Sequence, residues 1–122
     1  MLKIQFSNTN TEVEYLSALE TEEFFNGSSR RTLTITCAPD AISLDALNAL
    51  LTEENLASIT LYSEESGISN VYDGYVLKLS CGIKSELVQA ETPDSAAVYA
   101  DRLVIKLGRR TYIEEQLHRL GL

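Results

Sequence analysis

Residues 30–37 read Arg-Arg-Thr-Leu-Thr-Ile-Thr-Cys, and this stretch decides the predicted fold. Apolar residues alternate in it with threonines: Leu33, Ile35 and Cys37 against Thr32, Thr34 and Thr36. A period of two places the apolar side chains on one face of a β-strand and the threonines on the other. Because threonine suits a solvent-facing sheet surface, we predict a strand that is buried on one face, as is typical of antiparallel sheets.

A short leucine-rich helix is predicted just after this strand. Ser43 is a suitable N-cap, and Asp45 lies in the first turn, where the helix dipole favours an acid. Ile42 and Leu47 have the spacing of a hydrophobic staple across the cap. Leucines at positions 44, 47, 50 and 51 share one side, so a helix over about 44–52 should pack its leucine face on the sheet.

Other segments on both sides extend the pattern of strands. We expect strands at 2–6, 12–15, 56–63, 71–80, 85–91 and 102–107, with turns at 7–10, 26–29 and 64–67. Residues 17–25 are ambiguous, and 92–100 are interpreted as an excursion over the sheet or a one-turn helix.

A second helix is predicted near the end of the chain. Thr111 and Glu114 fit a capping box, and Gly121 is a suitable stop. Its apolar stripe would consist of Ile113, Leu117 and Leu120.

Length and composition favour a single domain over residues 1–122. With 122 residues, 44% of them hydrophobic, the chain can form one core without metal or disulfide staples. Short connections favour antiparallel neighbours. We therefore predict an α+β, β-rich fold: an antiparallel twisted sandwich or partly open barrel with two short packed helices.

The charge pattern excludes some function classes. The formal net charge is −8, and residues 1–77 carry twelve acids against three bases. This balance argues against binding a phosphate backbone, which requires lysine and arginine.

No apolar run approaches the roughly 20 residues that span a bilayer, and no secretory signal is visible. We expect a cytoplasmic protein, with virion association as a second setting, and two buried thiols at Cys37 and Cys81 that form no disulfide framework.

No constellation of catalytic, cofactor-binding or metal-ligating residues emerges from the pattern. His118 is the single histidine, and it cannot by itself supply a zinc set. Tyrosine is enriched at interfaces, and paired arginines can clamp a carboxylate or guard a sheet edge. The candidate interface residues are therefore Arg30, Arg31, Tyr62, Tyr72, Tyr75, Arg109 and Arg110.

The order of several segments resembles small proteins from prophage structural-gene regions of Gram-positive bacteria. The resemblance covers roughly residues 24–80: the Phe-Phe-Asn-Gly-Ser-Ser-Arg-Arg stretch that starts at Phe24, the capped leucine helix from Ser43, the strand that ends in Tyr62, and Tyr-Asp-Gly-Tyr at 72–75. It is a likeness of pattern, and it implies a tail-associated or baseplate-associated role with no catalytic residues.

Three hypotheses about function follow from these observations. The first is a non-enzymatic phage-like structural or assembly protein that acts through protein–protein contacts, including self-association. The second is an acidic adaptor or inhibitor that docks on a basic partner protein, which requires the acids of 12–23 and 53–65 to share a face. The third is a small hydrolase, which requires a pocket with two carboxylates of raised pKa.

Overall fold

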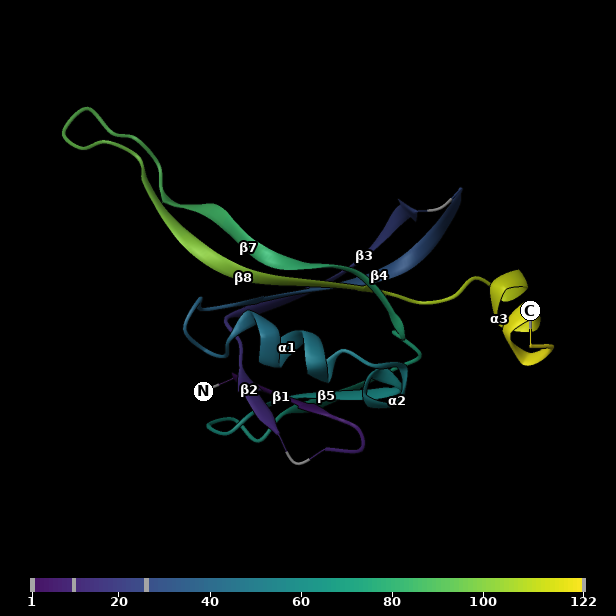
Figure 1. Ribbon diagram of the computed structural model, residues 1–122. Helices are drawn as coiled ribbons and strands as arrows, with labels where there is room; N and C mark the ends of the chain where they lie inside the picture. The colour runs from purple at the N-terminus through teal and green to yellow at the C-terminus, as the bar shows by residue number, and fades with distance from the viewer. Residues whose placement is uncertain (1, 10, 26, 122) are drawn as a thin grey trace.

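The computed structural model describes residues 2–9, 11–25 and 27–121. Within these residues the chain forms eight strands and three short helices, and the strands make two four-stranded antiparallel sheets (Figure 1). The predicted β-rich sandwich is therefore confirmed. The prediction of two helices was one too few. Asn10 and Asn26, which belong to two predicted turns, lie outside the described residues.

Each sheet is built from two hairpins that are far apart in the sequence. The first sheet has the order β2-β1-β5-β6, formed by β1 (Leu2–Phe6), β2 (Glu12–Glu14), β5 (Ser58–Ser63) and β6 (Ser69–Asp73). The second sheet has the order β3-β4-β8-β7, formed by β3 (Ser17–Phe25), β4 (Ser28–Cys37), β7 (Leu77–Gln89) and β8 (Val98–Gly108). In both sheets one strand from each hairpin lies at the centre, so long-range pairing ties the chain into one unit.

The hydrophobic core lies between the two sheets. The first sheet contributes Ile4, Phe6, Val13, Ile59 and Leu61, and the second contributes Leu33, Ile35, Cys37, Leu103, Ile105 and Leu107. The predicted apolar face of residues 30–37 is thus confirmed. The threonine face is less open than predicted. Thr32 is fully buried and lies opposite Gly108 of β8, which the side chains of Arg30 and Leu79 approach closely.

Two helices close the side of the core. In α1 (Leu44–Leu50) the hydroxyl of Ser43 accepts a hydrogen bond from the backbone N–H of Ala46 at 3.2 Å, and Leu47 is buried, as the capping pattern predicts. The helix α2 (Glu53–Leu56) follows directly and buries Leu56. It was missed because four residues are too few for a helical period to show.

The remaining differences from the predictions concern where the chain changes sheet. Residues 17–25 form β3, and 71–80 form no single strand, because β6 ends at Asp73 and β7 begins at Leu77. Gly74, at φ 82°, and the buried Tyr75 carry the chain across the core. The segments 85–91 and 92–100 belong to one long hairpin of β7 and β8 rather than to a separate strand and an excursion.

Two elements project from the sandwich in opposite directions. The outer part of the β7–β8 hairpin extends far beyond the core at one end of the molecule (Figure 1). The helix α3 (Tyr112–Arg119) follows β8 and lies beyond the core at the other end (Figure 1). We call residues 83–100 the arm.

Candidate interaction surfaces

A capping box starts α3, as the sequence predicts. The hydroxyl of Thr111 accepts a hydrogen bond from the backbone N–H of Glu114 at 3.3 Å. In return the Glu114 carboxylate accepts one from the backbone N–H of Thr111 at 2.8 Å. These bonds satisfy two N–H groups at the helix start that have no partner within the helix.

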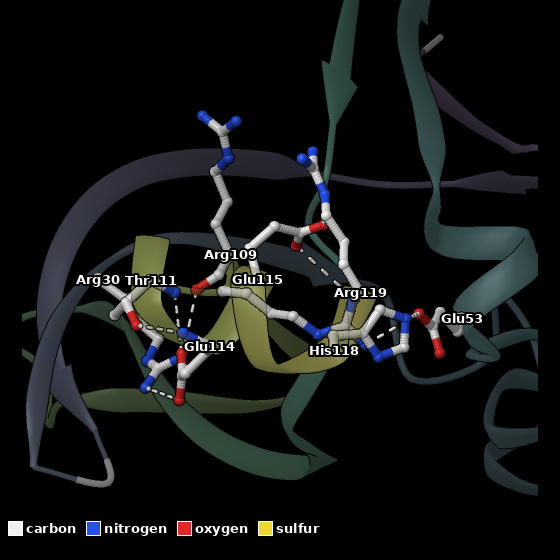
Figure 2. Close-up of polar contacts among 9 residues, drawn as sticks. Arg30, Glu53, Arg109, Thr111, Glu114, Glu115, His118 and Arg119 are labelled. Carbon is white, nitrogen blue, oxygen red and sulfur yellow. Dashed lines mark hydrogen bonds and ion pairs between the residues drawn. The ribbon is translucent and has the colours of Figure 1, made fainter. Parts of the chain in front are cut away.

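A buried arginine holds the same glutamate from the neighbouring sheet. The two terminal nitrogens of Arg30 donate to the two carboxylate oxygens of Glu114 at 2.6 and 3.0 Å (Figure 2). The guanidinium also donates to the backbone carbonyls of Phe25 and Arg109 and lies over the Phe25 ring. Among the described residues its Nε has no hydrogen-bond partner. Arg30 therefore clamps a carboxylate, but one of its own chain.

The clamp controls the ionisation of Glu114. The hydrogen bonds from Arg30, followed by the one from the Thr111 backbone, lower the pKa of this carboxyl from 4.5 to about 2. Glu114 is thus ionised throughout the neutral range, and its charge matches the buried guanidinium. The ion pair is a structural joint between β4 and α3.

Further polar contacts join α3 to α2. Glu53 accepts a hydrogen bond from Arg110 at 2.8 Å and pairs with Nε2 of His118 at 3.1 Å (Figure 2). The contact with Arg110 lowers the pKa of Glu53. Arg119 lies 3.8 Å from Glu115, one turn back on the same helix. The single histidine thus takes part in an ion-pair network at the surface.

A surface helix usually packs its apolar side on the core, whereas α3 contacts the domain through polar side chains. At 100° per residue, Glu114 and His118, which contact the body of the protein, lie on one side of the helix. The adjoining side carries four exposed apolar residues, which we call the α3 stripe: Tyr112, Ile113, Leu117 and Leu120. Ile113 is 70% exposed and Leu120 is 73% exposed. The prediction that this stripe packs on the domain was wrong, because α3 docks through its polar side.

The arm carries a second exposed apolar row. Directly opposed residues of antiparallel strands share a face, so Ile83 and Leu87 lie with their partners Leu103 and Tyr99. Leu103 is buried in the core, whereas Ile83, Leu87 and Tyr99 are 54%, 50% and 63% exposed. These three residues, the arm stripe, lie on the core face of the second sheet where it extends into solvent, and the polar pair Ser85 and Asp101 separates Ile83 from the other two.

The remaining predicted arginines and tyrosines divide between both sheets. Tyr75 is buried and donates a hydrogen bond to Glu20, which also pairs with Arg31 at 3.3 Å. Burial, aided by Glu20, raises the pKa of Tyr75 to about 12. The guanidinium of Arg109 lies 5.9 Å from the centre of the Tyr75 ring. Arg30 and Tyr75 are inside the fold, so they support it and offer no open contact surface.

Tyr62 and Tyr72 lie on paired strands but on opposite faces of the first sheet. β5 pairs with β6, but Tyr72 opposes the buried Ile59 and so lies on the core face, whereas Tyr62 alternates to the outer face. The Tyr72 ring instead meets Tyr75 edge to face, with ring centres 6.1 Å apart. The structure thus brings Arg30, Arg31, Tyr72, Tyr75, Arg109 and Arg110 to the α3 end of the molecule, and leaves Tyr62 apart.

A wide groove opens between β2 and the loop after β4. Its volume is about 620 Å³, and apolar walls from Tyr15 and Leu16 alternate with Glu12, Glu14 and Asp40. Within the described part of the chain, no group of three or more His, Cys, Asp or Glu residues could hold a metal ion. Cys37 and Cys81 are free thiols, and burial raises the pKa of both.

Sequence reasoning missed the two apolar stripes as surfaces. The residues were visible, because Ile113, Leu117 and Leu120 have helical spacing, and Ile83 and Leu87 are an even number of positions apart on one strand. Periodicity shows that residues share a face, and it does not show whether the same chain covers that face. The signal that could have helped is the acidic, turn-rich stretch 89–96, which is typical of a hairpin tip in solvent.

Comparison of the chain with protein-family models, with curated proteins and with solved structures finds no match. None of the helices in the described ranges has the length and apolar character needed to cross a bilayer. The features of the molecule that bear on its function are therefore the two apolar stripes and the ion pair between Arg30 and Glu114 that holds α3.

Proposed function

We propose that this chain is a non-enzymatic structural or assembly protein that acts through protein–protein contacts. The observation that carries the proposal is the orientation of α3, whose polar side binds the domain and whose apolar stripe faces solvent. Large exposed apolar patches with polar surroundings are typical of protein interaction sites. An exposed stripe on a helix held in place by a buried ion pair is a preorganised contact surface.

The ionisation of the paired carboxyls supports this role over that of a hydrolase. A general acid needs a raised pKa near the working pH. Among the described carboxyls with a resolved shift, the pKa is lowered in each case, at Glu20, Glu23, Glu53, Glu64 and Glu114, because each pairs with a neighbouring donor. These glutamates act as fixed anions that join elements of the fold.

The proposed setting is a phage-like particle, with the protein made in the cytoplasm and placed at the tail or baseplate. Its support is the resemblance of residues 24–80 to prophage structural-region proteins. A sandwich that presents apolar surfaces at two ends suits a component that must contact more than one neighbour.

The alternative function, an acidic adaptor that docks on a basic partner, has less support. Its acids would have to share one face, but they lie on β2, β3, α2 and the β5–β6 turn, which belong to both sheets and both ends of the domain. Several are already paired within the chain: Glu20 with Arg31, Glu23 with Lys106, Glu53 with Arg110, and Glu64 with Lys3.

The proposal is tested by measuring binding between the purified full chain and the purified products of the genes beside its own, one pair at a time. We expect at least one product to bind the wild-type chain, and Leu117→Asp in the α3 stripe to weaken that binding roughly tenfold or more. Glu115→Gln, on another side of α3, serves as the matched control and should leave binding unchanged. Absence of binding to every neighbouring product, together with a strictly monomeric chain, would overturn the proposal.

A further inference from the structure

We propose that the protein assembles head to tail, with the arm stripe of one copy bound to the α3 stripe of the next. This inference rests on the proposed function and names the partner as a second copy of the chain. It assigns Ile83, Leu87 and Tyr99 on one side, and Ile113, Leu117 and Leu120 on the other, to a single interface.

The first argument is the continuity of the arm stripe with the core. The strands β7 and β8 stay paired from the core to the hairpin tip. The face that buries Leu103 and Ile105 goes on to Ile83 and, beyond the polar pair Ser85 and Asp101, to Leu87 and Tyr99. Inside the domain this face is covered by the first sheet and α1. In the arm no described segment of the chain covers it, so a covering element must come from another molecule.

The second argument is the shape of the element that would cover it. Two or more helical turns with an apolar side are the usual cover of an open sheet face. The helix α3 has eight residues, and its apolar stripe is exposed. It cannot reach the arm of its own chain, since the two lie at opposite ends of the molecule (Figure 1).

The third argument is charge, which selects a second copy as the occupant. The arm (residues 83–100) contains three acids and one base, Lys84, whereas residues 109–120 contain three arginines against two glutamates. Glu114 is already paired with the buried Arg30, and Arg110 is paired with Glu53. The acidic arm and the basic α3 end therefore attract each other and repel their own kind.

The geometry makes the interface heterologous. Each copy uses a different surface toward each of its two neighbours, so the assembly either closes into a ring or continues as a filament. Association should depend on protein concentration, and raising the salt concentration should weaken it, because the charge contribution is screened.

The test is light scattering of the full chain from about 1 μM to about 1 mM, a range that covers weak and moderate association. The wild-type average mass should rise with concentration. Leu87→Asp in the arm stripe and Leu117→Asp in the α3 stripe should each give a monomer over that range. Ala96→Asp is the matched control: it adds the same charge at the exposed arm tip, leaves the stripe intact and should assemble. Circular dichroism checks that each variant is folded.

Mixing the two defective variants separates this interface from any other. Each variant keeps one intact surface, so an equimolar mixture should form a dimer with one copy of each and stop there, as native mass spectrometry of one isotope-labelled partner would show. A mixture that stays monomeric would overturn the proposal. Assembly by Leu117→Asp alone would also overturn it, because the arm would then pair with another arm.

Failure of this inference is distinct from failure of the proposed function. A wild-type chain that stays monomeric at every concentration, or that associates more strongly at high salt, overturns head-to-tail assembly. If that same chain binds a neighbouring gene product through α3, the structural role stands and its partner is a different protein.

Discussion

The inner and outer halves of the β7–β8 hairpin share one face of the second sheet but have opposite environments. In the inner half, Ile105 of β8 lies opposite Cys81 and is fully buried, whereas in the outer half Tyr99 lies opposite Leu87 and both are exposed. The strands and their pairing are continuous between the two halves. The first sheet and α1 thus cover only part of the second sheet, and the covered part ends near Ser85 and Asp101, a polar pair on the same face.

The largest expected effect is on the free energy of unfolding, and it should differ between a variant of the inner half and a variant of the outer half. Ile105→Ala should lower the free energy of unfolding by about 2–5 kcal/mol, because it leaves a cavity in the core. Leu87→Ala should change it by less than about 0.5 kcal/mol, because an exposed side chain loses little on truncation. Urea unfolding at low protein concentration, where no assembly forms, measures both. A loss of similar size at Leu87 would break the comparison and show that the arm is folded against its own domain.

Loss of the ion pair that holds α3 should have an intermediate effect on the free energy of unfolding, because the pair joins a buried arginine to a partly exposed glutamate. Glu114→Gln should lower the free energy of unfolding by about 1.5 kcal/mol, the low end for a hydrogen bond to a charged group, because solvent reaches the carboxylate. The matched control is Glu115→Gln, whose ion pairs are exposed and should contribute less than about 0.5 kcal/mol. Equal effects of the two changes would contradict the clamp.

The same joint should make stability depend on acid pH. In the folded state the pKa of Glu114 is about 2, below its ordinary value of 4.5. Its contribution is therefore fully present above about pH 4.5 and is lost as the pH falls toward 2. The difference between wild type and Glu114→Gln should shrink over that window. Unfolding curves at a series of pH values measure it, and a difference that stays constant down to pH 2 would contradict the assignment.

The smallest effect is expected at the start of α3. Thr111→Ala removes the capping hydroxyl and should destabilise the helix by about 1 kcal/mol. Because the α3 stripe is not packed on the domain, the change should open α3 locally and leave the core intact. Amide hydrogen exchange should accelerate in residues 112–120 and stay unchanged in β4 and β8. Faster exchange throughout the core would mean that α3 is part of the same cooperative unit.

Local patterns predicted the parts of the fold that depend on neighbouring residues. The alternation of residues 30–37, the cap at Ser43 and the capping box at Thr111 all appear where the sequence predicts them. Gly74 could be recognised as a break, but whether it bends one strand or sends the chain to the other sheet depends on Tyr75, which fills the core between them. The helix α2, with four residues, and the segment 17–25 show no hydrophobic periodicity from which their secondary structure could be predicted.

For the candidate contact residues, the sequence indicated the kind of contact, and only the fold identified the partners. The sequence indicated that Arg30 and Arg31 could clamp a carboxylate. Arg30 holds both oxygens of Glu114, whereas Arg31 makes a single contact with Glu20. These partners are 84 and 11 residues away along the chain, so spacing could not identify them. The proposed interface instead contains Leu87 and Leu117, residues that a pattern assigns to a core.

The sequence by itself determined the secondary structure of most segments, the two-faced character of the sheets and the acidity of the chain, because each depends on residues within a few positions of one another. Only the tertiary structure decided which apolar faces are covered. That outcome depends on the lengths of β7 and β8 relative to the sheet beneath them. It also depends on an ion pair between Arg30 and Glu114, which binds α3 by its polar side and leaves its apolar stripe to solvent.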